Sequence, residues 1–144
     1  MLEETTILKE HNLKVTPQRL AILTLLRSTH IHPSAETIYT NLQEAHPTMS
    51  LATVYKTLDS FVQNGLIQQL NIGEDSYRYD ANTSPHSHLK CISCNNVVDI
   101  HELKDSDNII SEVESRTGYK LLRQQFYFFG ICPTCQASKN QEEL

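Results

Sequence analysis

The sequence predicts an α+β fold, with a helical N-terminal part followed by a smaller part of mixed strands and helix. Three observations indicate this division. Apolar residues recur at helical spacing up to about residue 65, short alternating segments begin at Leu66, and the four cysteines form two Cys-x-x-Cys pairs in the second half. Because residues 81–85 have the composition of a linker, we expect one domain over residues 1–82 and another over residues 83–144.

Four helices are expected in the first domain. The first is short, over about residues 5–11. Thr16-Pro17 then supplies a capping hydroxyl and a proline suited to the first helical position, and Pro33-Ser34 starts the third helix. The leucine-rich segment that follows Thr16-Pro17 predicts that the second helix is largely buried.

The fourth helix has one apolar and one polar face. Ser50 caps it, the pattern continues over residues 51–64, and Gly65 stands in the C-terminal capping position. The apolar face consists of Leu51, Val54, Leu58, Phe61 and Val62. The opposite face carries Ala52, Thr53, Tyr55, Lys56 and Asp59.

A change of period at Leu66 predicts a β-hairpin. Residues 66–72 and 76–81 alternate as two antiparallel strands around a turn at residues 73–75. Helices followed by such a ribbon form a winged helix-turn-helix domain, which is the architecture we expect for residues 1–82.

The second domain is predicted to be a small α/β unit. After a strand, the first cysteine pair and another strand, we expect a helix over about residues 106–117 ended by Gly118 and a long strand over residues 119–131. Residues 137–144 have the composition of a disordered tail. So small a unit has little core of its own, which gives a metal staple a physical purpose.

The cysteines predict one structural zinc site. Cys91, Cys94, Cys132 and Cys135 are all the cysteines of the chain, and four thiolates fill a tetrahedral shell with no open position for a reacting water. Two disulfides or a thioredoxin-like redox pair are the alternatives. The acidic start of the chain gives no sign of a secretory signal, and neither pair stands at the start of a clear helix, so we expect zinc in a reducing, cytoplasmic compartment.

Composition limits the possible functions. The 144 residues include 12 Lys+Arg and 17 Asp+Glu, for a formal net charge of −5. No apolar run approaches the length of a membrane span, so no membrane partner is expected. A chain this acidic does not attract nucleic acid through its net charge, and any DNA binding must come from local placement of cations.

The exposed N-terminal end of the fourth helix favours DNA recognition. The small side chains of Ala52 and Thr53 suit thymine methyl groups, and Tyr55 adds apolar contact or a hydrogen bond, which favours A/T-rich DNA. An ordinary solvated helix face is the alternative. The cations available for phosphates or a minor groove are Lys14, Arg19, Lys56 and Arg78. With so few cations we expect a homodimer that reads two half-sites of a palindromic operator in double-stranded DNA.

A second metal site is expected from histidines and aspartates. His86 and His88 fall on one face of a strand, and Asp80, Asp99 and His32 are candidates to join them. Such a mixed nitrogen and oxygen shell suits Fe(II) or Mn(II), and zinc is also compatible with it. Surface or hydrogen-bonded side chains are the alternative for each, and we assign that ordinary role to His11, His30, His46 and His101.

Four stretches of the chain resemble the ferric uptake regulator (Fur) family of bacterial metal-dependent repressors. They are Val15–Arg19, His32–Tyr39, Ser50–Leu58 and His86–Cys94. The resemblance implies an N-terminal winged helix and a C-terminal dimerisation domain whose four cysteines bind structural zinc. The chain is most similar to peroxide-sensing members, whose regulatory ligands match His32, Asp80, His86, His88 and Asp99.

The resemblance also implies a mechanism. With Fe(II) bound, peroxide would react at the iron and oxygen would be added to His32 or His86, giving 2-oxo-histidine, loss of the ligand and relief of repression. Mn(II) would support DNA binding without this reaction. One alternative is a Fur-type repressor that responds to iron, manganese or zinc without sensing peroxide. Another is a zinc-dependent hydrolase, for which nothing in the sequence marks a substrate cleft, so we expect no enzyme activity.

Overall fold

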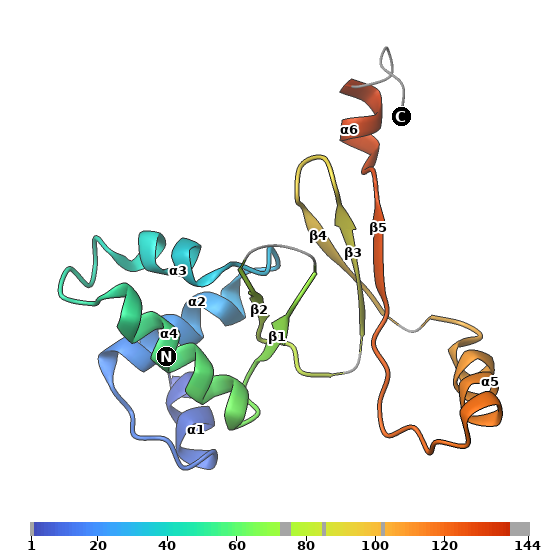
Figure 1. Ribbon diagram of the computed structural model, residues 1–144. Helices are drawn as coiled ribbons and strands as arrows, with labels where there is room; N and C mark the ends of the chain where they lie inside the picture. Colours follow the sequence, from blue (N-terminus) through green and yellow to red (C-terminus); the bar gives the residue numbers. More distant parts are fainter. Residues whose placement is uncertain (1, 73–75, 85, 102, 139–144) are drawn as a thin grey trace. The chain divides into compact units, whose positions relative to one another are not determined.

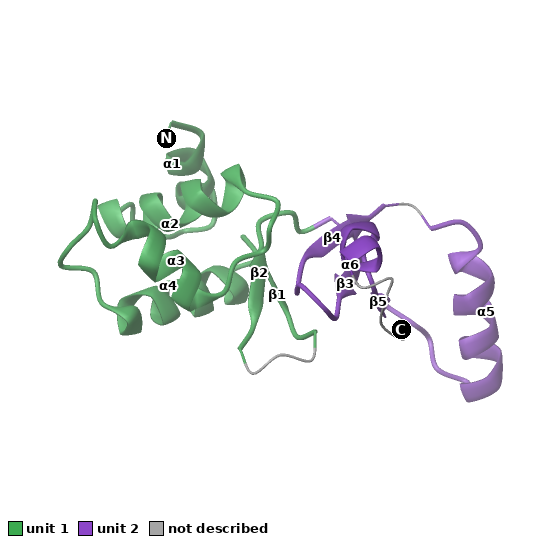
Figure 2. Ribbon diagram, turned by 90° about the horizontal axis from the view of Figure 1, so that it is seen from above, with its two compact units in different colours: residues 1–83 green, residues 84–144 purple. Residues whose placement is uncertain are grey.

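The computed structural model describes residues 2–72, 76–84, 86–101 and 103–138. The expected wing turn, Pro85 of the linker and most of the expected tail lie outside these ranges. The chain divides into two compact units, residues 1–83 and 84–144 (Figure 2). Helices fill the first unit and a small sheet lies at the centre of the second, so the predicted α+β fold is confirmed.

Unit 1 contains the four expected helices (Figure 1). They are α1 (Leu2–Glu10), α2 (Pro17–Ser28), α3 (Ala35–Leu42) and α4 (Leu51–Gln63). Helix α1 begins three residues earlier than expected, because Glu3 and Glu4 stand in its first turn, where carboxylates interact favourably with the helix dipole. Both carboxylates also pair with Arg27 of α2, which ties the two helices together.

The hydroxyl caps predicted at Thr16 and Ser50 are present, and Ser34 forms a third. Thr16 accepts a hydrogen bond from the backbone of Arg19, Ser34 from Thr37 and Ser50 from Thr53, at 3.2, 3.2 and 3.1 Å. Each cap satisfies one of the amides that a helix leaves without a partner at its N-terminus. The starts of α2, α3 and α4 are therefore encoded locally.

The core of unit 1 lies between α2, α3 and α4. Val54, Leu58 and Phe61 of α4 are each 0% exposed and pack in one cluster with Ile22 of α2 and Ile38 of α3. The apolar face of α4 therefore points inward as the sequence indicates, and its other face is left for solvent or a partner.

The wing is a short hairpin attached to the loop before α3. Strands β1 (Gln68–Leu70) and β2 (Arg78–Asp80) are antiparallel, and each is shorter than expected. Tyr79 is 2% exposed within the core, and its burial raises the pKa of the phenol to about 12. Its backbone amide donates to the carbonyl of Pro33 at 3.0 Å, so β2 is fixed to the segment that leads into α3.

Unit 2 is built on a three-stranded sheet of order β4-β3-β5. Strand β3 (Ser87–Cys91) pairs antiparallel with β4 (Val97–Ile100) and parallel with β5 (Tyr127–Gly130). Between β4 and β5 lies α5 (Ser106–Thr117), which Gly118 ends with a φ of +76°, as expected of a C-terminal capping glycine.

Three expectations for unit 2 are wrong. The long strand expected over residues 119–131 is reduced to β5, because side chains at the end of α5 accept hydrogen bonds from the backbone amides that follow. The Thr117 hydroxyl accepts from the amide of Tyr119 at 3.2 Å, and the Glu114 carboxylate accepts from the amide of Leu121 at 2.9 Å. The chain also forms an unexpected short helix, α6 (Pro133–Ser138), so Cys132 does stand at a helix start and residues 137 and 138 are helical.

Replacement of Phe61 by alanine tests the core assignment. Phe61→Ala should lower the free energy of unfolding of unit 1 by about 3–5 kcal/mol, because it leaves a cavity among fully buried side chains. The control is Gln63→Ala, two residues along the same helix at an exposed position. Urea denaturation followed by helical circular dichroism measures both; equal stability of the two variants would contradict the assignment.

Candidate metal centres

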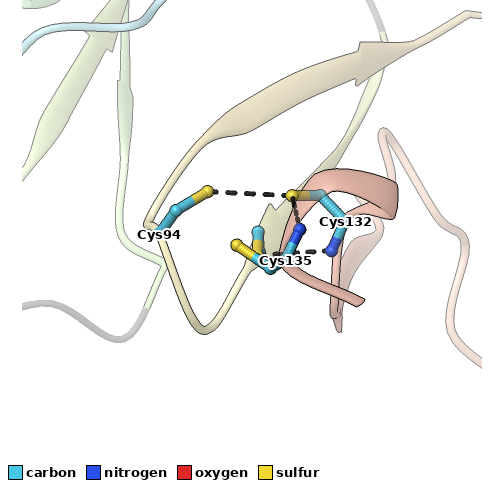
Figure 3. Close-up of side chains that lie close together, drawn as sticks. Cys94, Cys132 and Cys135 are labelled. Atoms are coloured by element: carbon cyan, nitrogen blue, oxygen red, sulfur yellow. Dashed lines mark hydrogen bonds between the residues drawn. The ribbon is translucent and has the colours of Figure 1, made fainter. Parts of the chain in front are cut away.

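The four cysteine thiols converge at one end of the sheet in unit 2. Cys91 ends β3, Cys94 lies in the turn that follows, and Cys132 and Cys135 lie at the start of α6 (Figure 3). All four sulfur atoms lie within 4.8 Å of one another, and Sγ of Cys94 is 3.9 Å from Sγ of Cys132. In a tetrahedral site with Zn–S bonds of about 2.3 Å, sulfur atoms lie about 3.8 Å apart, so the separation fits a shared zinc ion.

Backbone amides prepare Cys91 for metal binding. The amide of Cys132 donates to Sγ of Cys91 at 3.3 Å. This hydrogen bond and a second from the amide of Cys94 lower the pKa of the Cys91 thiol to about 6. A thiol that ionises below neutral pH supplies the thiolate that a metal ion requires.

The alternatives for the cysteines fit this geometry less well. A disulfide requires a sulfur–sulfur bond of about 2.05 Å, and all four cysteines are free. The start of α6 beside Cys132 and Cys135 is a feature of redox pairs that the sequence did not reveal. A redox pair does not account for the approach of Cys91 and Cys94 to the same point, whereas one shared ion does.

Unit 2 also holds two imidazoles against one carboxylate. His88 on β3 lies opposite Asp99 on β4 in the antiparallel ladder. The Nε2 atoms of His86 and His88 each lie 3.4 Å from Oδ1 of Asp99, and the two ring centroids are 4.5 Å apart. Three potential metal donors thus converge at the end of β3 opposite to Cys91.

Hydrogen bonding fixes which nitrogen of His86 faces Asp99. Nδ1 of His86 lies 2.7 Å from the carbonyl oxygen of Ser84. A carbonyl only accepts, so Nδ1 carries the hydrogen and Nε2 of the neutral ring holds a lone pair. A metal ion bound by both residues would lie between Nε2 and Oδ1 of Asp99, and their separation of 3.4 Å is close to the separation of about 3.3 Å between ligands 2.0–2.1 Å from a tetrahedral ion. The donor set therefore fits a metal ion.

Unit 1 holds the other two expected ligands. His32 lies in the loop between α2 and α3, and Asp80 ends β2. Nδ1 of His32 is 3.6 Å from Oδ2 of Asp80, which is beyond hydrogen-bond distance, and both residues are buried. The backbone amide of Asn82 donates to the other carboxylate oxygen of Asp80 at 2.9 Å and fixes its orientation.

A cavity of about 120 Å³ adjoins His86 within unit 2. Its lining is polar at Ser87 and Ser106 and apolar at Ile100 and Phe126. The volume holds several water-sized molecules, so a small polar solute has room beside the imidazole.

The exposed face of α4 contains a contact that sequence reasoning missed. Ala52 and Lys56 are exposed, Thr53 and Tyr55 are half-buried, and the Tyr55 hydroxyl donates to the Glu36 carboxylate of α3. This hydrogen bond lowers the pKa of Glu36 and raises that of Tyr55. The phenol of Tyr55 is thereby held in one orientation at the surface of the helix.

The expected cations differ in what they contact. Lys14 is exposed, and Arg19 donates to the Lys14 carbonyl at 2.7 Å, which holds both residues at the start of α2. Arg78 makes a contact that its expected role at phosphates or a minor groove did not include, because its guanidinium donates to the carbonyls of Ile31 and His32.

Comparison with known proteins identifies relatives over nearly the whole chain. A transcriptional regulator PerR of Clostridium acetobutylicum is 51% identical over 136 residues, which cover 94% of this chain and 98% of that protein. The peroxide operon regulator of Bacillus subtilis is 37% identical over 140 residues, 96% of this chain and 94% of that protein. Within the described part of the chain, no helix has the length and apolar character needed to cross a membrane.

Solved structures show the same relationship. The ferric uptake regulator of Helicobacter pylori, described as having three functional metal-binding sites, matches with a TM-score of 0.77 at 25% identity over 94% of this chain and 91% of that one. PerR of Streptococcus pyogenes, described in terms of peroxide sensing and gene regulation, matches with a TM-score of 0.50 at 36% identity over 90% and 88%. Residues 10–129 match the ferric uptake regulator family. The resemblance seen in the sequence is thus confirmed, and the chain belongs to the ferric uptake regulator family.

Proposed function

We propose that this protein is a metal-dependent, DNA-binding transcriptional repressor that senses peroxide through Fe(II)-catalysed oxidation of a ligating histidine. The observation that carries the proposal is the approach of two imidazole Nε2 atoms, those of His86 and His88, to one oxygen of Asp99. Relatives that cover nearly the whole chain are named as peroxide-responsive regulators, which supports this use of the site.

The regulatory metal would be bound by five residues. His32 and Asp80 would supply one nitrogen and one oxygen from unit 1, and His86, His88 and Asp99 would supply two nitrogens and one oxygen from unit 2. Neither group alone offers more than three ligands, whereas the two together would make the mixed shell that suits Fe(II) or Mn(II). A metal ion shared by both groups would link the two units, so its loss would change the DNA-binding arrangement.

The two sets of ligands suit two metals with different roles. The Cys91, Cys94, Cys132 and Cys135 site would hold zinc as a structural ion, because four thiolates leave no position for a reactant. Bound at the histidine and aspartate ligands, Fe(II) would supply the electrons that split the O–O bond of peroxide. Zinc-bound thiolates are comparatively protected from peroxide, so the sensing reaction would not use them.

Oxidation would fall on a ligand that peroxide can approach. In the net reaction one peroxide oxygen replaces hydrogen at the C2 carbon of the imidazole, giving 2-oxo-histidine, and the other oxygen leaves as water. His86 has a cavity beside it that admits a small polar molecule. His32 is the second candidate, as a ligand from the other unit. A ring oxidised at C2 loses ligand strength, which would release the metal and the DNA.

DNA would be bound by the N-terminal end of α4 in a homodimer. Ala52, Thr53 and Tyr55 would contact base edges of an A/T-rich palindromic operator, and Lys14, Arg19 and Lys56 would contact phosphates. The hydrogen bond from Tyr55 to Glu36 supports this, because a fixed phenol loses less conformational freedom when it contacts a base. Such a regulator would act in the cytoplasm and would have no enzymatic turnover.

Mass spectrometry tests the sensing reaction. The Fe(II)-loaded protein is treated with hydrogen peroxide, digested and compared with the Mn(II)-loaded protein treated in the same way. We expect one added oxygen on the peptide that contains His86 or the peptide that contains His32, in the Fe(II) form only. The peptide that contains His11, which is separate from both ligand peptides, serves as the internal control. If neither ligand peptide gains oxygen, the protein responds to metal levels without sensing peroxide.

Zinc analysis tests the cysteine site. Cys91→Ser should abolish stoichiometric zinc and impair the folding of unit 2 or dimerisation, because it opens the thiolate shell at the end of β3. Ile92→Ser, at the adjacent exposed position, should retain zinc. Elemental analysis and size-exclusion chromatography with light scattering measure both effects; a folded, zinc-free Cys91→Ser dimer would overturn the structural role.

A further inference from the structure

Strand β2 is joined to the His32 loop by consecutive residues. Nη2 of Arg78 donates to the carbonyl of Ile31 at 2.8 Å, and Nε of the same guanidinium donates to the carbonyl of His32. The next residue, Tyr79, donates its amide to the carbonyl of Pro33 at 3.0 Å. Three successive carbonyls of the loop are therefore bound by two successive residues of the wing.

The loop needs this support because His32 has a left-handed backbone. Its φ is +53°, a region that residues with a β-carbon seldom adopt. A strained conformation persists only where its surroundings fix it. The planar guanidinium of Arg78 donates along two fixed directions and so sets the orientation of the peptide groups on either side of the His32 α-carbon. The direction of the His32 side chain follows from that backbone.

The same strand face supplies the carboxylate that faces His32. Arg78 and Asp80 are two residues apart, so both project from one face of β2. The guanidinium binds the backbone of His32, while Oδ2 of Asp80 lies 3.6 Å from its imidazole. A single short strand thus fixes one expected ligand and supplies another.

We infer that Arg78 is a positioning residue for the regulatory metal. It acts through the backbone of His32 and couples the conformation of the wing to that of this ligand. The inference rests on the proposed function, since it presupposes that His32 binds the metal. It assigns to Arg78 a role in metal affinity beyond the phosphate contact expected from its charge. Binding or loss of the metal at His32 would then change the conformation of β2 directly.

A merely structural arginine would have a different signature. If Arg78 only stabilised the fold, its loss would lower stability and would affect metal binding equally whether or not His32 is present. If it acts through His32, its loss has no further effect on metal affinity once the imidazole is removed. A double-mutant cycle between the two positions separates these cases.

The experiment measures Mn(II) affinity by calorimetry for the zinc-loaded full chain and for Arg78→Gln, Arg78→Lys, His32→Ala and the double variant. We expect Arg78→Gln to weaken Mn(II) binding about 10- to 100-fold, as is usual when a group that orients a ligand is removed. The Mn(II) affinity of Arg78→Lys should lie between those of Arg78→Gln and the parent, because lysine keeps the positive charge but lacks the two fixed donor directions of the guanidinium. The double variant should bind as His32→Ala does.

Arg27→Gln is the matched control. Arg27 joins α1 to α2 through Glu3 and Glu4, so its loss destabilises unit 1 without touching the loop. It should lower the melting temperature and leave Mn(II) affinity unchanged. Hydrogen exchange on the metal-free protein gives an independent readout, in which residues 29–35 should exchange faster in Arg78→Gln and at the parental rate in Arg27→Gln.

The outcomes separate this inference from the function on which it rests. If His32→Ala binds Mn(II) as tightly as the parent, the proposed ligand set is wrong. If His32→Ala weakens binding but both Arg78 variants bind as the parent does, the ligand set stands and the role of Arg78 is overturned. If Arg78→Gln lowers Mn(II) affinity by the same factor in the parent and in the His32→Ala background, the role of Arg78 is also overturned, in favour of a general structural role.

Discussion

The convergence of four thiols at one end of a small sheet is the constraint on which the rest of unit 2 depends. Cys91 ends β3 and Cys132 follows β5, so one ion would lock the parallel pair of strands together. The other end of β3 presents the imidazoles of His86 and His88 to Asp99. Zinc binding at the cysteines would therefore also restrict the conformation of β3 at its other end, where we propose that peroxide is sensed.

The two kinds of donor explain how one chain can use two metals differently. Four thiolates saturate an ion and protect it, whereas imidazoles and carboxylates form a shell that accepts several divalent metals and exchanges them more easily. The ligands that we propose for the second kind of site are divided between the units, as His32 with Asp80 and as His86 and His88 with Asp99. A structural ion and a regulatory ion can thus coexist without competing for ligands.

Much of the fold could be predicted from the sequence where the signal is local. The caps at Thr16 and Ser50 and the glycine at position 118 mark helix ends through contacts within a few residues. The strand expected over residues 119–131 is mostly absent because the Glu114 carboxylate accepts a hydrogen bond from the amide of Leu121, seven residues along the chain, and no periodicity reveals this contact. Candidate ligands could be chosen by residue type and spacing, but the role of Arg78 depends on a contact 46 residues away in the chain.

The central claim is that peroxide acts on a histidine beside iron and not on a thiol. The most direct measurement is operator binding by the Fe(II)-loaded and Mn(II)-loaded proteins after peroxide treatment, each followed by a thiol reductant and fresh metal. Histidine oxidation predicts that the Fe(II) form loses DNA binding, that the reductant does not restore it, and that the Mn(II) form is unaffected. Loss of binding in both forms, with recovery in the reductant, would place the sensor at the cysteines and contradict the account.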